Sequence, residues 1–181
     1  MKNIILVSIL ILSLSASAQK YFTKTGLTEF KASVEAFESV EAKNESTTAI
    51  LNTKTGDIAA LLFVKAFHFE IALMEEHFNE NYMDSDKFPK ATFIGKIESY
   101  SMDKLSDMEK EFTLNGTLTV RGKAKLIKAA ILVKKVNNKI VLTSEFNVSP
   151  QDFDIDIPNI VRKKIAKSIN LKLCYELVEK K

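Results

Sequence analysis

Apolar and polar residues alternate along most of the chain, which is the pattern of strands that bury one face. In residues 27–37, Phe30, Ala32, Val34 and Ala36 share one face, and polar or charged residues share the other. The same period recurs in residues 47–52, 91–100, 112–126, 129–136, 140–148 and 169–177. Each segment is predicted to be a strand whose apolar face points to a common core.

A longer apolar run covers residues 58–71. Its apolar face extends from Ile58 to Val64, changes phase after Lys65 and continues at Phe67 and Phe69. One extra residue on a strand produces such a change, so a β-bulge is predicted near Lys65. The length of the run also permits a buried helix, but its β-branched and aromatic content favours a strand.

Two segments depart from the alternation. Apolar residues in 73–78 recur at intervals of three and four, which predicts a short helical turn, and turn-forming residues make 79–86 a loop. Pro158 can occupy the first position of a helix. An apolar stripe of Ile157, Ile160, Val161 and Ile165 then predicts a short amphipathic helix over 157–166.

Many strands, hairpin-length links and little helix predict an antiparallel sheet. Because nearly every strand has one apolar face, the sheet is expected to close or to pack on itself, which also removes exposed edges. Periodicity alone does not separate a barrel from a sandwich.

One stretch identifies a family. It begins at His77-Phe78 and ends with Lys87-Phe88-Pro89-Lys90-Ala91-Thr92-Phe93. This string resembles the signature of the YceI-like family, which are exported lipocalin-like barrels that bind polyisoprenoid lipid. The glycine-flanked segment 116–122 is similar to a strand of that family, whereas 151–154 departs from the Ser-Asp-Phe-Gly string of many members. The resemblance implies an all-β fold, an antiparallel eight-stranded lipocalin-like barrel with one or two short helices.

The N-terminus has the features of a signal peptide. Residues 4–14 are almost wholly apolar but too short to span a bilayer, and an Ala-x-Ala site follows at 16–18. Cleavage before Gln19 is expected, which leaves one domain, 19–181, in the periplasm; the alternative is a short anchor that stays in place. Cys174 is the single cysteine, so no internal disulfide can form, and it is expected to be a buried small apolar residue.

Composition and motifs argue against several functions. The formal net charge is +3, and lysines are interspersed with glutamates, so no nucleic-acid-binding stripe is present. The two histidines, His68 and His77, have no partner at metal-ligand spacing, and His77 is expected to tie its loop by hydrogen bonds. No nucleophile elbow or phosphate-binding loop is present. Neither an enzymatic activity nor a metal site is expected.

The inward positions of the predicted strands indicate a binding site. An eight-stranded barrel either fills its interior with side chains or leaves room for one small ligand. Small residues are mixed with aromatic ones at these positions, which favours an elongated apolar cavity. The residues expected to line it are Phe30, Ala32, Val34, Leu62, Val64, Phe67, Phe69, Phe93, Ile97, Leu118, Val120, Leu142, Phe146, Leu171 and Leu173.

The resemblance implies that an isoprenoid lipid or a quinone occupies this cavity, for transport, storage or sequestration. Arg121, Lys123 and residues 162–164 are candidates for holding its head group, although such charges are also typical of a solvated face. A collapsed barrel with a structural or interaction role is the alternative. An enzyme acting on the lipid would need inward polar residues, for which only Ser144 and Lys65 are candidates. Membrane contact through 157–166 and a homodimer are further expectations.

Overall fold

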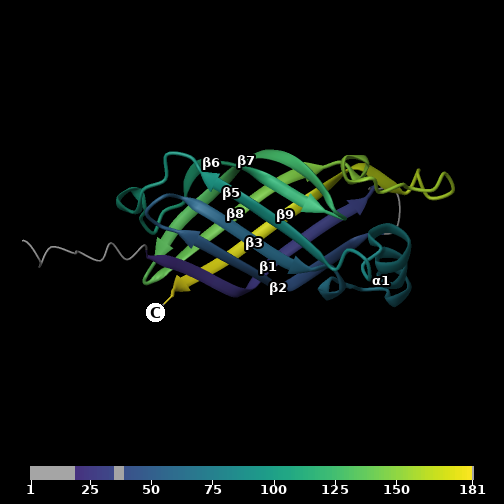
Figure 1. Cartoon of the computed structure of the whole chain (residues 1–181), viewed down its shortest axis with the longest axis horizontal. Coiled ribbons are helices and arrows are strands. Elements are labelled where there is room, and N and C mark those ends of the chain that lie inside the picture. The colour runs from purple at the N-terminus through teal and green to yellow at the C-terminus, as the bar shows by residue number, and fades with distance from the viewer. Residues whose placement is uncertain (1–18, 35–38, 181) are drawn as a thin grey trace, which may run out of the picture.

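The fold is described from a computed structural model that covers residues 19–34 and 39–180 (Figure 1). The predicted signal peptide and Ala36 lie outside these residues. Eight long strands form the wall: β1 (Lys20–Ser33), β2 (Glu41–Asn52), β3 (Asp57–Phe63), β5 (Lys90–Ile97), β6 (Lys110–Val120), β7 (Lys123–Val136), β8 (Lys139–Val148) and β9 (Ile165–Glu179).

These strands are antiparallel and follow the order β1-β9-β8-β7-β6-β5-β3-β2, and β2 pairs with β1 to close the ring. The fifteen-residue β9 and the fourteen-residue β1 pair along much of their length, from Tyr21 opposite Glu179 to Ser33 opposite Ile165. The prediction of a closed eight-stranded barrel is confirmed, because each of the eight long strands pairs with a neighbour on both sides.

The strand predicted over 58–71 is interrupted at the expected place. A 3-10 turn (Val64–Ala66) separates β3 from the two-residue strand β4 (His68–Phe69), which also pairs with β2. Between the pairs Thr48–Leu61 and Ala42–Phe69, six steps along β2 correspond to eight on the other side. The irregularity near Lys65 therefore inserts two residues as a turn, not the single residue of a simple bulge.

The strand predicted over 112–126 is wrong, because the chain reverses inside it. Arg121 and Gly122 form a two-residue turn between β6 and β7, with φ of 50° and 74°. Positive φ at both positions is the geometry of tight hairpin turns. A second two-residue turn, Asn137-Asn138, joins β7 to β8, and Val136 pairs with Lys139 across it.

The helix predicted over 157–166 is also wrong. The amides of Val161 and Arg162 both donate to the carbonyl of Pro158, and the chain stays in turns until β9 begins at Ile165. Pairing of Ile165 with Ser33 draws the segment into the sheet before a helix can extend, and Ile160 is left 88% exposed. The predicted helical turn near residue 73 is present as α1 (Ala72–His77), and a π-helical segment (Phe78–Met83) replaces part of the predicted loop.

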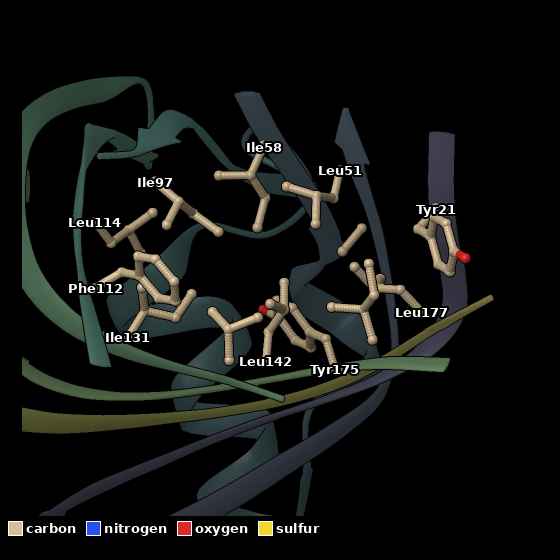
Figure 2. Close-up of a cluster of buried hydrophobic side chains, with 13 residues drawn as sticks. Tyr21, Leu51, Ile58, Ile97, Phe112, Leu114, Ile131, Leu142, Tyr175 and Leu177 are labelled. Atoms are coloured by element: carbon tan, nitrogen blue, oxygen red, sulfur yellow. The ribbon is translucent and has the colours of Figure 1, made fainter. Parts of the chain in front are cut away.

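The two ends of the barrel differ. At one end lie the C-terminus, the start of β1 and the β5–β6 connection; at the other lie α1 and the β8–β9 connection, which we call the mouth (Figure 1). Near the first end a cluster of buried side chains fills the interior (Figure 2). This basal core consists of Tyr21, Ala49, Leu51, Ile58, Ile97, Phe112, Leu114, Ile131, Val133, Ile140, Leu142, Tyr175 and Leu177.

Candidate functional site

A cavity of about 640 Å³ occupies the barrel between the basal core and the mouth. Side chains from all eight long strands line it, together with α1, the π-helical segment and the β8–β9 connection. This follows from the strand period, because every second residue of a closed sheet points inward. Most lining groups are apolar, and the volume is within the range of small-molecule sites.

All but two of the residues expected at the cavity do line it. They are Phe30, Ala32, Leu62, Val64, Phe67, Phe69, Phe93, Leu118, Val120, Leu142, Phe146, Leu171 and Leu173. Whether they contact a ligand stays a prediction.

The two exceptions lie beyond the two ends of the cavity. Ile97 is fully buried in the basal core, because β5 ends beyond the floor of the cavity. Val34 follows the last residue of β1, is 37% exposed, and donates its amide to the carbonyl of Lys164. Both side chains therefore lie outside the cavity wall.

Four phenylalanines gather near the mouth. Phe30 comes from β1, and Phe78 begins the π-helical segment. Phe67 immediately precedes β4, and Phe69 is the last residue of β4. In five of the six pairs the ring centroids lie between 5.2 and 5.7 Å apart, and three of these five contacts are edge-to-face. Such contacts add to the energy of burial. The cluster fixes α1 and the π-helical segment to the barrel, so these helices cover part of the mouth. Phe78 was absent from the expected lining, although it belongs to the family string.

Phe93 lies over a pair of glycines on the cavity wall. Gly95 and Gly116 face each other on β5 and β6. A Cβ built on Gly95 would lie 2.7 Å from a ring carbon of Phe93, and Gly116 is covered by the same ring. The two glycines, which have no side chain, therefore let the ring lie against the wall.

His77 does not play the expected role. Its imidazole lines the cavity, but it makes no hydrogen bond to any residue that the structure describes. The segment is held instead by Asn79 Nδ2, which donates to the carbonyl of Glu75 at 2.9 Å, and by the amide of Phe88, which donates to Asp84.

Most of the basic residues expected to hold a head group are engaged elsewhere. Arg121 Nη1 donates to the carbonyl oxygen of Asp154, and Lys123 Nζ lies 2.7 Å from a carboxylate oxygen of the same residue. Arg162 donates to the carbonyl of Ile157. These contacts hold the β8–β9 connection in place. Of residues 121, 123 and 162–164, Lys164 alone lines the cavity.

Three hydroxyl groups lie together on the cavity wall next to the basal core. Thr28 Oγ1 is 2.8 Å from Thr47 Oγ1 and 3.0 Å from the hydroxyl oxygen of Tyr175. All three side chains are at most 5% exposed, and all three line the cavity. Burial raises the pKa of Tyr175, and hydrogen bonds with Thr28 and Thr47 oppose that rise. The phenol is therefore neutral near pH 7.

A family model of the YceI-like domain matches residues 14–177. This chain belongs to the YceI-like family. No curated protein matches it.

Three solved structures share the fold of this YceI-like chain at low sequence identity. A polyisoprenoid-binding domain of Saccharophagus degradans has a TM-score of 0.77 at 10% identity, and the alignment covers 89% of this chain and 98% of that one. BcnA of Burkholderia cenocepacia has a TM-score of 0.69 at 14% identity, with coverage of 84% and 96%. The Campylobacter jejuni YCEI protein has a TM-score of 0.62 at 18% identity, with coverage of 80% and 87%.

The hydroxyl cluster of this YceI-like barrel was missed from the sequence. Of the two inward polar candidates, Ser144 does face the interior and donates to the carbonyl of Ala130 at 2.7 Å. Lys65 does not, because its ammonium lies on the exposed surface 2.6 Å from Asp86. A signal was present, since Thr28 and Tyr175 each fall on the apolar face of their strands.

The wall of the YceI-like barrel has a gap near the mouth. β7 and β8 pair only from Ile131 opposite Ser144 to Val136 opposite Lys139. Beyond these pairs the strands separate, and a smaller pocket of about 300 Å³ lies between them. The ion pair of Lys125 with Asp152, at 2.7 Å, joins β7 to the 3-10 turn (Pro150–Phe153) that follows β8.

Other candidate chemistry is sparse. Among the residues described, no group of three or more His, Cys, Asp or Glu side chains is arranged to hold a metal ion. Cys174 is half-buried on the outer face of β9, and burial raises the pKa of its thiol. No helix within 19–34 and 39–180 combines the length and the apolar character needed to cross a bilayer.

Proposed function

We propose that this YceI-like protein holds one long apolar lipid, an isoprenoid chain, inside its barrel. The observation that carries this proposal is the continuous apolar cavity of about 640 Å³ above the basal core. The chain's membership of the YceI-like family supports it, as does the fold shared with a polyisoprenoid-binding domain of Saccharophagus degradans. Binding and release, without a chemical step, are the proposed activity.

The energetics favour a flexible hydrocarbon ligand. Each CH2 group moved from water into an apolar cavity contributes about 0.8 kcal/mol. The wall needs no rearrangement to accept a chain, because strands and the four phenylalanines already hold its shape, which keeps the ordering cost of binding low. A barrel with only a structural role would be expected to extend its basal core to the mouth.

The proposed place of action is the periplasm, and the support is the signal-peptide pattern of residues 1–18. We further propose that the mouth approaches a membrane surface to exchange lipid. Ile160 and Leu73 stand 88% and 57% exposed on mouth segments, and Arg162 and Lys163 follow Ile160. Exposed apolar side chains next to basic ones are suited to anionic bilayer surfaces.

Native mass spectrometry of protein purified without detergent tests the main proposal. The proposed function predicts an added mass of one lipid, which organic solvent should release for identification. Protein that carries no lipid and takes up no polyprenol from a mixed suspension would contradict it.

A further inference from the structure

The wall of the barrel is open between β7 and β8, although each of these strands stays paired on its other side. The last β7–β8 pair toward the mouth joins Ile131 and Ser144. Beyond it, β7 remains paired with β6 as far as Lys123, and β8 remains paired with β9 as far as Val148. The β7–β8 gap is therefore a break in the wall between two intact pairs of strands.

Two side chains separate this gap from the cavity. The pocket of about 300 Å³ in the gap and the cavity of about 640 Å³ have only Phe146 and Val148 in common among their lining residues. Both side chains come from β8, and both are half-buried. A change of side-chain rotamer is fast compared with the separation of paired strands. A rotation of Phe146 would therefore join the two spaces without any rearrangement of the backbone.

The outer end of the gap is held by one exposed ion pair. Lys125 Nζ of β7 lies 2.7 Å from a carboxylate oxygen of Asp152, and both residues line the gap. Exposed ion pairs add little to stability and are weakened by salt. Leu126, the next residue of β7, also lines the gap and is 82% exposed. An apolar chain that crosses the wall here passes an apolar side chain, and it crosses where β7 and β8 are not paired.

The segments that lie across the mouth are held more firmly. The ring contacts of the four phenylalanines fix α1 and the π-helical segment to the barrel. The β8–β9 connection is held through Asp154, which contacts both Arg121 and Lys123. Displacement of either segment breaks several of these contacts, whereas widening the gap breaks one exposed ion pair. The gap is therefore the part of the wall that opens most easily.

We infer that the β7–β8 gap is a lateral passage through which the apolar ligand enters and leaves the cavity. Phe146 closes the passage on the inside, and the ion pair of Lys125 with Asp152 holds it on the outside. This inference rests on the proposed function and adds the route of exchange to it. Because the gap lies near the mouth, it stays within reach of a membrane that the mouth approaches.

A cross-link across the gap tests this route. Lys128 and Asn147 line the gap from β7 and β8. The test protein carries Lys128→Cys with Asn147→Cys in a Cys174→Ser background, and a short bis-maleimide joins the two new thiols within one molecule. Stopped-flow fluorescence with a dansyl-labelled polyprenol gives the association and dissociation rate constants. The cross-link should lower both by about tenfold or more and leave the Kd unchanged, because it closes the route and not the cavity. The same protein before cross-linking is the control and should exchange lipid at the wild-type rates.

Removal of the ion pair gives an independent test in the opposite direction. Lys125→Met with Asp152→Asn changes two residues that do not line the cavity. Both rate constants should rise by the same factor, about 2-fold to 5-fold, with the Kd unchanged. The matched control is Lys134→Met with Glu109→Gln, which removes an ion pair of 2.9 Å from the part of β7 that is paired with β8. Its rate constants should equal those of wild-type protein.

Wild-type rate constants in the cross-linked protein would overturn the lateral passage but leave the proposed function intact, since the polyprenol would still be bound. Failure of wild-type protein to bind the polyprenol would instead overturn the proposed function, and the inference with it. If the ion-pair variant does not fold, the cross-linked protein still decides the question, because it is made from folded protein.

Discussion

The ring of Tyr175 lies against the backbone of Gly26, 2.6 Å from the position that a Cβ atom would take there. The carbonyl of Thr47 closes the same space at 3.0 Å. The absence of a side chain at Gly26 thus lets β1 approach Tyr175 closely, and this approach places the tyrosine hydroxyl beside Thr28. A glycine on β1 and a tyrosine on β9 together fix the floor of the cavity.

Gly26→Ala is therefore expected to destabilise the fold. The added methyl meets a buried ring, and overpacking of this kind costs roughly 1–3 kcal/mol, against roughly 0.5–1 kcal/mol that alanine gains over glycine inside a strand. Urea denaturation measures the loss. The control is a double-mutant cycle in the Tyr175→Ala background, where the substitution should cost much less. An equal cost in both backgrounds would show that the contact with Tyr175 is not the cause.

Alkaline stability should depend on Tyr100. Burial, with a smaller effect of Tyr21, raises the pKa of Tyr100 from 10.0 to about 12. The folded state holds the proton more tightly than the unfolded state, so the stabilisation is complete below pH 10 and is lost as the pH rises toward 12. Urea midpoints measured across this window should fall less steeply for Tyr100→Phe than for wild-type protein. The pKa values of Tyr21 and Tyr175 are also raised, so the urea midpoint of Tyr100→Phe should still fall to some extent. Equal slopes for the variant and the wild-type protein would contradict the role assigned to Tyr100.

Hydrogen exchange should reveal the gap between β7 and β8. The β7 amides directed toward β8 are expected to exchange faster between residues 125 and 129 than between 131 and 136, because only the second group faces paired residues of β8. The β7 amides directed toward β6 provide the internal control, since that pairing continues from Lys123 to Val133. Uniform protection along β7 would show that the strands stay paired in solution.

Association with anionic vesicles should depend on the mouth. Ile160→Asp is expected to weaken it, and so is the charge reversal Arg162→Glu with Lys163→Glu. A basic residue near an anionic surface contributes about 1 kcal/mol, so the double reversal should lower association by more than about tenfold. Met108→Asp is the control, because Met108 is 74% exposed on the β5–β6 connection, away from the mouth. Unchanged association of both mouth variants would remove the proposed membrane contact.

Much of the barrel could be predicted because alternation reports which face of a strand is buried. Phe30, Phe93 and Leu171 were placed on the inner wall in this way, and all three line the cavity. Alternation does not report depth along the barrel axis. Ile97 has the same period as Phe93 on β5, yet it lies in the basal core, because depth depends on the stagger between strands.

The two errors in secondary structure have local physical causes. In residues 112–126 the apolar alternation continues through the hairpin, although the two-residue turn shifts the inward positions of the strand by one residue. Ala124 and Leu126 therefore lie on the outer face, where Leu126 is 82% exposed, and Gly122 is the main local signal of the reversal. Residues 157–166 carry a helical apolar stripe, but a long-range pairing of Ile165 with Ser33 decides their structure. The hydroxyl cluster was missed because a threonine counts as polar in a period-two pattern, although Thr28 is buried.

Two alanines that are adjacent on β3 allow the most direct test of the central claim. Ala60 lines the cavity, whereas Ala59 lies on the other face of the strand, opposite Ile94 of β5. Uptake of a polyprenol by Ala60→Trp, Ala59→Trp and wild-type protein should be measured at equal concentrations, after circular dichroism has shown that all three are folded. If the lipid occupies the barrel, Ala60→Trp should bind with about one tenth of the wild-type affinity or less, because the indole takes space from the chain, and Ala59→Trp should bind normally. Undiminished binding by a folded Ala60→Trp variant would contradict the account.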